Sequence, residues 1–515
     1  MALLRPIATI GGYTLISRVL GFLRDVLVAA YLGAGPVADA FFVAFKFPNF
    51  FRRLFAEGAF NAAFVPIFAG MVATAGREAA RRFAEDAMAV LLAVLFALLI
   101  VAELTMPWIM RGLAPGFVTD PAKFTLAVEL TRITFPYLLF ISLVSLQGGV
   151  LNSLDRFGAV ALTPVLLNLC LIGGLVGLAG LTPTPGHALA WGVAGAGVAQ
   201  FLWLAWATDR AGMSLSLPLP RLTPEVKRLL TLMLPAALGA GVVQVNLLID
   251  IVIASLLPTG AVSYLYYADR IYELPLAVIG IAIGTALLPA LARQARRGET
   301  AEAVATLNRG LEAALLLSLP ATAALVVLPL PIISVLFERG AFGAAEAAAT
   351  ASALAAYAVG LPAYVLIKVL APGFYAREDT KTPVKIAVVC VIANTAVALA
   401  LMGPFAHVGI AFATAASAWM NVAALAAILR RRGHLVPDAA LLKRTPRMIL
   451  ASLIMGGVLW WLLPLLDGWL RDTLVWRGAA LAVLVAAGML VFAVAALLTG
   501  AADRGEIGRL FKGAA

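Results

Sequence analysis

The stretch FAEDAMAVLLAVLFALLIVAELTMPWIM, residues 83–110, decides the fold class of this chain. From Ala87 to Met110 its only charged residue is Glu103. An α-helix needs about 20 apolar residues to cross a bilayer, and this stretch exceeds that length. It also lacks the strict alternation of polar and apolar residues that a membrane β-strand shows. The stretch therefore predicts a membrane-spanning helix.

The composition of the whole chain agrees with this prediction. Of its 515 residues, 63% are hydrophobic and 13% are charged, and the mean hydropathy is +0.99. Soluble domains have about 45–50% apolar and about 25% charged residues. The composition excludes a cytosolic enzyme, a secreted disulfide scaffold and a disordered chain.

Residues that could carry cofactor chemistry are few and scattered. The chain has two cysteines and three histidines, and it contains neither an HExxH motif nor a phosphate-binding GxxxxGK[ST] loop. We therefore expect no resident cofactor, no ATPase site and no catalytic activity. The excess of Lys and Arg over Asp and Glu, 38 against 27, is interpreted as loops that face anionic lipid rather than nucleic acid.

Apolar stretches of spanning length recur along the chain, and they predict an all-α polytopic membrane protein with about fourteen transmembrane helices. The predicted spans are roughly 7–32, 36–60, 83–110, 128–152, 158–181, 187–209, 228–256, 264–292, 306–330, 346–371, 384–404, 408–430, 446–466 and 477–500. The first is interpreted as a retained helix, because Arg18, Arg24 and Asp25 interrupt it where a signal peptide would be uncharged.

The loop charges predict the orientation of these spans. With the N-terminus inside, the cytoplasmic segments hold 25 Lys and Arg residues and the opposite side holds five, Arg111, Lys123, Arg339, Arg471 and Arg477. Cytoplasmic loops of membrane proteins carry the excess of positive residues. We therefore expect both termini in the cytoplasm.

An internal repeat predicts two similar lobes. Residues 135–168 align without a gap on residues 361–394, so that Pro136 meets Pro362 and Asn168 meets Asn394. The repeat joins the fourth span to the tenth and keeps its direction, which is typical of a parallel repeat in a transporter. The predicted division is a lobe over 1–215, a second lobe over 216–433, and two further helices with a tail over 434–515.

Charged residues inside the spans indicate a polar interior. An Arg at the centre of a spanning helix costs about 2.5–3.5 kcal/mol on insertion scales. The spans nevertheless contain Arg18, Arg24, Arg52 and Arg270, together with Asp25, Asp39, Glu57, Asp269 and Glu273. Two interpretations stay open: a structural network in which carboxylates neutralise each Arg, or an electropositive cavity that receives an anionic group. Arginine suits the second, since its planar fork binds phosphate and carboxylate bidentately.

Several long motifs in order resemble the MurJ/MviN family of lipid II flippases, within the multidrug/oligosaccharidyl-lipid/polysaccharide exporter superfamily. They are SRVLGFLRDVLVAAYLG (17–33), ADAFFVAFKFPNFFRRLFAEGAFNAAFVPIF (38–68), ADRIYELPLAVIGIAIGTALLPALAR (268–293), LFERGAFG (336–343) and APGFYAREDTKTPVKI (371–386). The resemblance implies fourteen helices, two pseudo-symmetric six-helix lobes around a central cavity, and a bacterial inner-membrane location. It implies movement of the undecaprenyl-pyrophosphate-linked peptidoglycan precursor to the outer leaflet, by alternating access, for cell-wall synthesis.

The resemblance also implies site residues. Arg18, Arg24, Arg52 and Arg270 match arginines associated with the pyrophosphate–sugar head group, and Asp25, Asp39, Asn49, Glu57 and Glu273 match supporting or gating polar positions. Asp250, Asn394 and Thr414 match ligands of a sodium site, although Ala398 stands where a second carboxylate would help. For Asp250, sodium binding, proton transfer and a hydrogen bond between helices all stay open.

The last two predicted helices carry Trp460, Trp461, Trp469 and Trp476. Such residues anchor helix ends at the membrane surface, while the resemblance implies a groove for the lipid tail. The expected partners are lipid II, membrane lipids and cell-wall synthesis proteins, with Na⁺ or H⁺ as coupling ion. Rival functions are export of another polyprenyl-pyrophosphate oligosaccharide, export of cationic drugs, a cell-wall scaffold or a membrane glycosyltransferase.

Overall fold

The computed structural model describes residues 4–53 and 60–502. These residues form helices and connecting loops, and their only β-type pairing is an isolated bridge between Arg339 and Phe342. Nine helical stretches of the described part are long and apolar enough to cross a membrane. The predicted all-α membrane fold is thus confirmed, while the count of fourteen spans stays a prediction.

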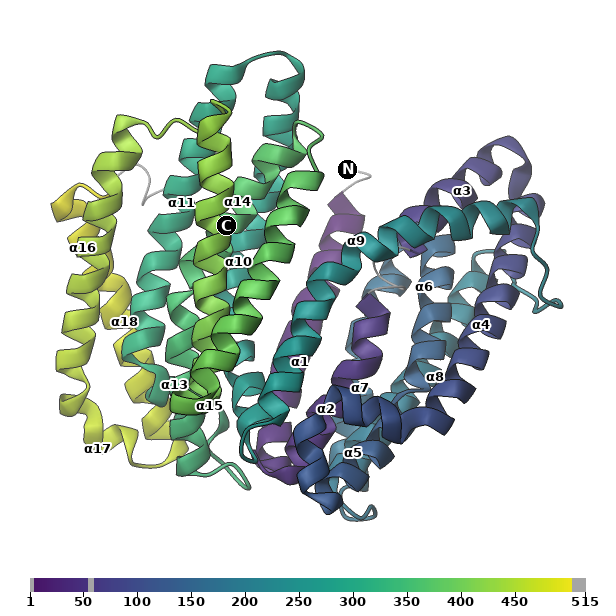
Figure 1. Ribbon diagram of the computed structural model, residues 1–515, viewed down its shortest axis with the longest axis horizontal. Coiled ribbons are helices and arrows are strands. Elements are labelled where there is room, and N and C mark those ends of the chain that lie inside the picture. The colour runs from purple at the N-terminus through teal and green to yellow at the C-terminus, as the bar shows by residue number, and fades with distance from the viewer. Residues whose placement is uncertain (1–3, 54–59, 503–515) are drawn as a thin grey trace. The chain divides into compact units, whose positions relative to one another are not determined.

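The helices fall into two compact units (Figure 1), which are residues 1–263 with 339–342 and residues 264–338 with 343–515. The first unit contains α1 (Leu4–Leu32), α2 (Pro36–Phe51), α3 (Phe60–Thr74), α4 (Gly76–Leu113), η2 (Pro115–Thr119), α5 (Pro121–Thr134), α6 (Tyr137–Ser153), α7 (Phe157–Leu178), α8 (Pro185–Arg210), α9 (Pro224–Ser255) and the start of α10 (Ala261–Arg296). The second contains the rest of α10, α11 (Thr300–Val327), α12 (Pro329–Phe337), α13 (Ala344–Val359), α14 (Leu361–Tyr375), α15 (Lys381–Arg431), α16 (Ala439–Leu462), η3 (Pro464–Leu466), α17 (Asp467–Leu470) and α18 (Leu474–Thr499).

Local sequence signals explain where many of these helices begin. Proline occupies the first turn of α2, α5, α8, α9 and α12, where its missing N–H leaves no intrahelical bond unmade. The side chains of Asp120, Thr223 and Asp438 accept hydrogen bonds from backbone amides in the first turns of α5, α9 and α16. The helix starts therefore follow from short motifs rather than from tertiary packing.

Helix breaks recur at matching positions of the repeat. The spanning stretch 121–153 breaks between α5 and α6 at Phe135 and Pro136, and the stretch 344–375 breaks between α13 and α14 at Gly360. The repeat places Pro136 on Pro362, the second residue of α14. The chain therefore bends at equivalent points in both units.

The α15 element consists of two helices joined at a sharp kink. Ala406 has φ 47° and ψ −131°, which is far from helical geometry, and Pro404 lies two residues before it. The two halves correspond to the separate spans expected at 384–404 and 408–430. The backbone thus divides this 51-residue element where the sequence pattern divides it.

The proline-containing segment between α8 and α9 is a loop that contacts α4. The Glu85 carboxylate of α4 accepts hydrogen bonds from the backbone N–H and hydroxyl of Ser216, at 2.9 and 2.8 Å. Arg81 holds the same oxygen at 2.7 Å. These bonds fix the segment to the first unit. The predicted lobe boundary at residue 215 stays a prediction.

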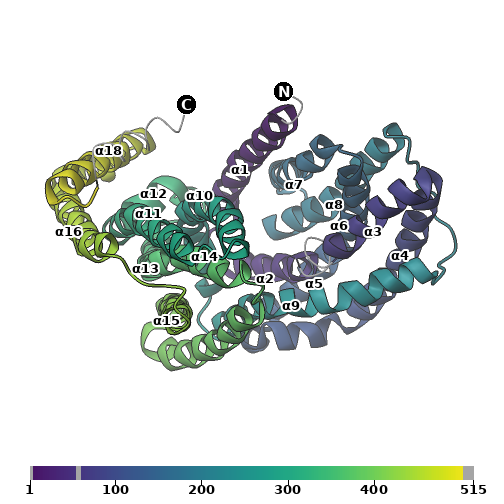
Figure 2. The same ribbon diagram turned by 90° about the horizontal axis from the view of Figure 1, so that it is seen from above.

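Within the second unit, α16 and α18 lie side by side next to α11 (Figures 1 and 2). Arg444 of α16 pairs with Glu312 of α11, and Arg309 bridges Glu312 at 2.7 Å to Asp438 at 3.0 Å. The Glu312 residue is only 6% exposed. This ion network attaches the start of α16 to α11.

Candidate functional site

Arg24 lies at the centre of a polar contact between α1 and α7. Its Nε and Nη2 donate to one Asp25 carboxylate oxygen, at 3.1 and 2.7 Å, and its Nη1 donates to Asn168 Oδ1 at 3.0 Å. The amide of Asn168 donates in turn to the Ser17 carbonyl oxygen, at 3.0 Å. Asp25 and Asn168 are each 5% exposed. Hydrogen bonds to Asp25 and Asn168 therefore fix the orientation of the Arg24 guanidinium.

Arg52 follows the last residue of α2 and is oriented by its own helix. Its Nε donates to Asn49 Oδ1 at 2.9 Å, and the Asn49 amide donates to the Phe45 carbonyl oxygen at 2.8 Å. Pro48 stands within this helix and has no N–H to donate, but α2 continues to Phe51. Asn49 thus links Arg52 to the helical backbone near the proline.

Asp39 is the most enclosed of the predicted acids that the structure describes. It is 1% exposed and pairs with Lys123 Nζ at 2.7 Å, while Lys123 is 5% exposed. The same carboxylate accepts hydrogen bonds from the backbone N–H groups of Gly260 and Ser263, at 2.8 and 3.0 Å, and from the Ser263 hydroxyl at 2.6 Å. Asp39 therefore caps the N-terminus of α10, where a carboxylate is favoured by the helix dipole.

Arg270 contacts Glu273 as its spacing on one helix predicts. Their Nη1 and Oε2 atoms are 3.3 Å apart, and the guanidinium carbon lies 4.9 Å from the centre of the Tyr266 ring. The side chains are 30% and 44% exposed. Both residues belong to the second unit, whereas Arg18, Arg24 and Arg52 belong to the first. Convergence of the four arginines on one cavity stays a prediction.

The remaining predicted residues are placed as follows. Arg18 is exposed on α1, and none of the hydrogen bonds or ion pairs among the described residues involves its side chain. Glu57 lies outside the described residues. Asp250 is half-buried on α9 in the first unit, and Asn394 and Thr414 lie on α15 in the second.

Two of the predicted sodium ligands, Asn394 and Thr414, lie on α15. Thr414 donates its hydroxyl to the Ile410 carbonyl oxygen at 3.1 Å, which leaves the hydroxyl lone pairs for a cation. Asn394 is 1% exposed. Across residues 4–53 and 60–502, no group of three or more His, Cys, Asp or Glu side chains could hold a metal ion. The sodium site at Asp250, Asn394 and Thr414 stays a prediction.

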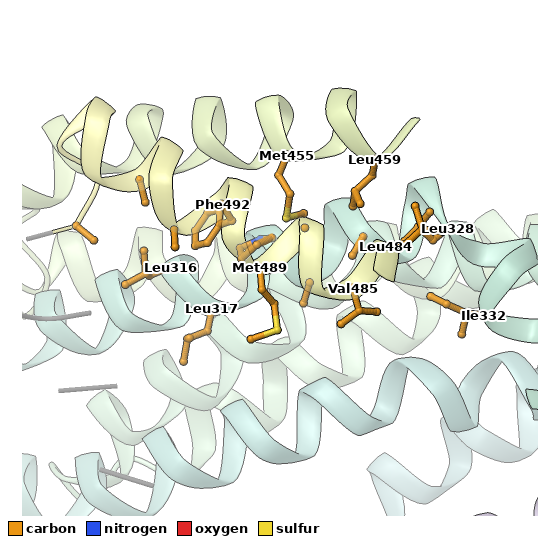
Figure 3. A pocket seen from close by; sticks show the side chains of 17 residues that line it. Leu316, Leu317, Leu328, Ile332, Met455, Leu459, Leu484, Val485, Met489 and Phe492 are labelled. Atoms are coloured by element: carbon orange, nitrogen blue, oxygen red, sulfur yellow. The ribbon is translucent and has the colours of Figure 1, made fainter. Parts of the chain in front are cut away.

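An apolar groove of about 490 Å³ lies between α16 and α18 on one side and α11 and α12 on the other (Figure 3). Its walls include Leu317 and Leu328 from the α11 side, Met455 from α16, and Met489 and Phe492 from α18. Such a lining matches a hydrocarbon chain and offers no partner to a charged group.

Sequence reasoning missed several residues that the structure brings to these contacts. Lys123 counts as a loop cation in the charge tally above, but the structure buries it in the first turn of α5. The Asp120–Pro121 pair signals a helix that begins at residue 121, and this signal could have shown that Lys123 belongs to a helix and not to a loop. Asn168, Ser17 and Ser263 carry no local signal, because their partners are distant in sequence.

Comparisons with known proteins agree with the motifs. A family profile described as lipid II flippase MurJ matches residues 28–480. A probable lipid II flippase MurJ of Rhizobium tropici is 46% identical over 520 residues, covering 99% of this chain and 97% of that protein.

Solved structures extend the comparison. A lipid II flippase MurJ in an inward closed conformation matches with a TM-score of 0.80 and 26% identity, covering 95% of this chain and 98% of that chain. An inward-facing multidrug resistance MATE transporter matches with a TM-score of 0.67 at 15% identity, over 81% and 94% of the two chains, and so shares the fold alone. With motifs, profile, relatives and fold in agreement along its length, the chain belongs to the MurJ family of lipid II flippases.

Proposed function

We propose that this chain moves lipid II, the undecaprenyl-pyrophosphate-linked disaccharide peptide, from the inner to the outer leaflet of a bacterial cytoplasmic membrane. It is a transporter and not an enzyme. The observation that carries the proposal is the match to lipid II flippases over nearly the full chain. The substrate combines a long apolar tail with a doubly charged pyrophosphate, and this protein has both apolar spans and arginines within them.

The proposed mechanism is alternating access by two lobes. Arg18, Arg24, Arg52 and Arg270 replace the hydration of the pyrophosphate, because guanidinium forks bind its oxygens bidentately. Asp25 and Asn168 support this role for Arg24 by orienting its guanidinium before the substrate arrives. The tail remains in an apolar medium throughout, either lipid or the groove beside α16 and α18.

The source of energy in this proposal is the membrane potential, an ion gradient or consumption of the product, since the sequence contains no phosphate-binding loop. We assign uptake of the coupling cation, Na⁺ or H⁺, to Asp250. Moving one charge through 100 mV supplies about 2.3 kcal/mol. Transport by the Asp250→Asn variant, measured with and without Na⁺ at fixed membrane potential, tests the assignment; unchanged coupling in the variant would exclude it.

The decisive experiment for substrate identity is rescue of a bacterium depleted of its lipid II flippase. Expression of this chain should restore growth and cell shape. Absence of growth, with the protein present in the inner membrane at a normal level, would contradict the proposal. Rescue of an oligosaccharide-flippase mutant instead would favour another polyprenyl-pyrophosphate substrate.

A double variant tests whether Arg270 serves the substrate or only its neighbour. If Arg270 merely neutralises Glu273, then Arg270→Gln/Glu273→Gln removes both charges and should restore function, because no unpaired charge remains. If Arg270 binds pyrophosphate, the double variant should stay inactive and Arg270→Lys should keep partial transport. We expect the second result, and transport near wild type by the double variant would overturn it.

A further inference from the structure

A second cavity, of about 870 Å³, lies in the second unit at the junction of α11 with α12 and of α16 with α17. We call it the charged cup, after Glu338, Asp467, Arg471 and Arg477 in its lining. Arg477 Nη1 is 3.1 Å from Glu338 Oε1 and donates to the Ser334 hydroxyl at 3.3 Å. Arg471 Nε is 2.9 Å from Asp467. The cup thus holds two ion pairs.

The two ion pairs differ in their access to solvent. Arg477 and Glu338 are 22% and 20% exposed and form the inner pair. Arg471 and Asp467 are 79% and 51% exposed and form the outer pair. The outer pair is therefore open to an incoming ligand, while the inner pair holds α18 against α12.

The cup adjoins the apolar groove described above. Leu328 and Ile332 line the groove, and their sequence neighbours Val327 and Pro331 line the cup. The groove is lined by α11, α12, α16 and α18 (Figure 3). The cup is lined by the end of α11, α12, the start of α13, the η3–α17 segment that follows α16, and Arg477 of α18. The cup therefore places four charged side chains near the apolar groove, and both volumes lie in the range of about 300–1,000 Å³ that is typical of ligand sites.

The position of the cup along the helices matches a membrane surface. It lies where α11 and α16 end, whereas the basic residues of this unit, such as Arg296 and Arg444, lie toward the other ends of the helices. Trp469 and Trp476 contact each other at this end, with ring centres 5.1 Å apart. Tryptophan concentrates at headgroup level, and by the positive-inside rule this end faces the outer leaflet.

The two arginines and two carboxylates of the cup indicate which class of lipid headgroup it can bind. A purely anionic headgroup meets two carboxylates in the cup, and a purely cationic one meets two arginines. A headgroup with a phosphate and an amine can satisfy both members of the outer pair. A primary ammonium donates hydrogen bonds to a carboxylate, whereas a trimethylated one has no N–H to donate.

We propose that the charged cup and the apolar groove bind a phospholipid with a zwitterionic primary-amine headgroup, phosphatidylethanolamine, from the outer leaflet. Arg471 holds its phosphate, Asp467 holds its ammonium group, and one acyl chain enters the groove. The site uses none of the arginines assigned to lipid II, and it stands whether or not the chain flips that lipid.

Native mass spectrometry of the full chain tests the headgroup. The protein is equilibrated with equal amounts of phosphatidylethanolamine, phosphatidylcholine and phosphatidylglycerol that carry the same acyl chains. We expect phosphatidylethanolamine to occupy the protein about tenfold more than either competitor, which is the effect of one charge-assisted hydrogen bond. Equal occupancy, or a preference for the anionic lipid, would overturn the proposal.

Variants of the outer pair locate the site. Asp467→Asn should abolish the preference over phosphatidylcholine, and Arg471→Gln should lower occupancy by every phospholipid. Both side chains are more than half exposed, so the fold should persist, and thermal unfolding of each variant checks this. The matched control is Arg111→Gln, an exposed arginine that contacts Trp108 in the other unit and should change nothing. An unchanged preference in Asp467→Asn would exclude the cup.

A groove variant tests the acyl chain separately. Ala321 lines the groove, and Ala321→Phe should reduce occupancy by all three lipids while the preference among headgroups persists. Full occupancy in this variant would show that the acyl chain does not enter the groove. The measurement of bound phospholipid does not depend on transport. A failure to rescue flippase-depleted cells would therefore not change the outcomes expected here.

Discussion

At the scale of single residues, polar side chains inside this membrane protein are held by specific partners. Arg24 contacts Asp25 and Asn168, and Asp39 contacts Lys123 and Ser263. In a medium of low dielectric constant, a charge that loses its partner is expensive. Two substitutions test these contacts. One keeps the charge of an arginine but changes its geometry, and the other removes one charge of a buried ion pair.

Arg24→Lys keeps the positive charge but loses the planar fork that contacts Asp25 and Asn168 together. We expect rescue of flippase-depleted cells to fall severely at an unchanged protein level. Arg156→Lys is the matched control, since Arg156 is exposed at the start of α7. Full rescue by Arg24→Lys would show that only the charge matters.

Lys123→Met removes the cation from the buried pair with Asp39. Breaking a buried ion pair on one side costs about 3–5 kcal/mol, because the remaining charge is left uncompensated. The three donors that Asp39 retains on Gly260 and Ser263 should place the loss near the lower end of that range. Thermal unfolding in detergent measures the loss, and Lys385→Met, at an exposed lysine, serves as control. An equal melting temperature for Lys123→Met and wild type would contradict this account.

At the scale of elements, short connections between helices carry tight backbone contacts. The turn Arg339–Phe342 belongs to the first unit, and the Ala341 N–H donates to the Ala30 carbonyl oxygen of α1 at 2.8 Å. Gly340 has φ +58°, and a Cβ there would lie 2.3 Å from that same oxygen. Position 340 thus requires glycine for two reasons: its φ is positive, and a Cβ would collide with the backbone of α1.

Gly340→Ala should destabilise the protein more than Gly298→Ala. Gly298 also has a positive φ, +72°, but a Cβ there would meet no atom within 4 Å. Left-handed geometry costs an alanine roughly 1–2 kcal/mol at either site, and only Gly340→Ala adds a clash with backbone. Thermal unfolding of the two variants gives the difference, and equal losses would refute the contact.

The loop after α15 gives a pH-dependent contribution to stability. Burial, together with the guanidinium groups of Arg377 and Arg432, lowers the pKa of His434. Asp379, whose own pKa is lowered by hydrogen bonds from Thr382 and Arg432, holds Arg432 in place. The unfolded chain therefore binds a proton more readily than the folded one, and stability falls as the pH drops below about 6.5, the ordinary value for His.

His434→Gln should flatten this dependence, since glutamine does not titrate in the window. The measurement is the melting temperature of both proteins between about pH 7.5 and about pH 5, which spans roughly a unit or more on each side of the ordinary His value. We expect the two curves to separate only below about pH 6.5. Parallel curves would show that other groups cause the acid sensitivity.

At the scale of the whole molecule, the loop charges predict the topology in the membrane. Both termini should be cytoplasmic, because 25 of the loop Lys and Arg residues fall on one side. Burial of Lys123 removes one cation from the opposite side and so sharpens the asymmetry. Reporter fusions after Arg432 and at Ala515 should both give a cytoplasmic signal, and a periplasmic signal at Ala515 would require an odd number of spans.

The sequence by itself determined the class of protein, the approximate positions of many helices and the family. Hydropathy is a local sum, so a stretch such as 83–110 specifies a spanning helix without knowledge of its neighbours. Proline and capping residues are equally local, which is why the starts of α8 and α9 lie within a few residues of the predicted spans. The contact between Arg270 and Glu273 was predictable for the same reason, since one helix turn joins them.

Tertiary structure alone decided which polar groups from distant parts of the sequence meet. Asp39 and Ser263 are 224 residues apart, and Arg24 and Asn168 are 144 apart. Their pairing depends on the rotation and depth of each helix, and these follow from packing between helices rather than from the hydropathy of either one. The charged cup and the apolar groove arise in the same way, because α11 and α12 line both cavities together with segments more than 100 residues later in the chain, beyond residue 450. These segments become neighbours only after the chain has folded.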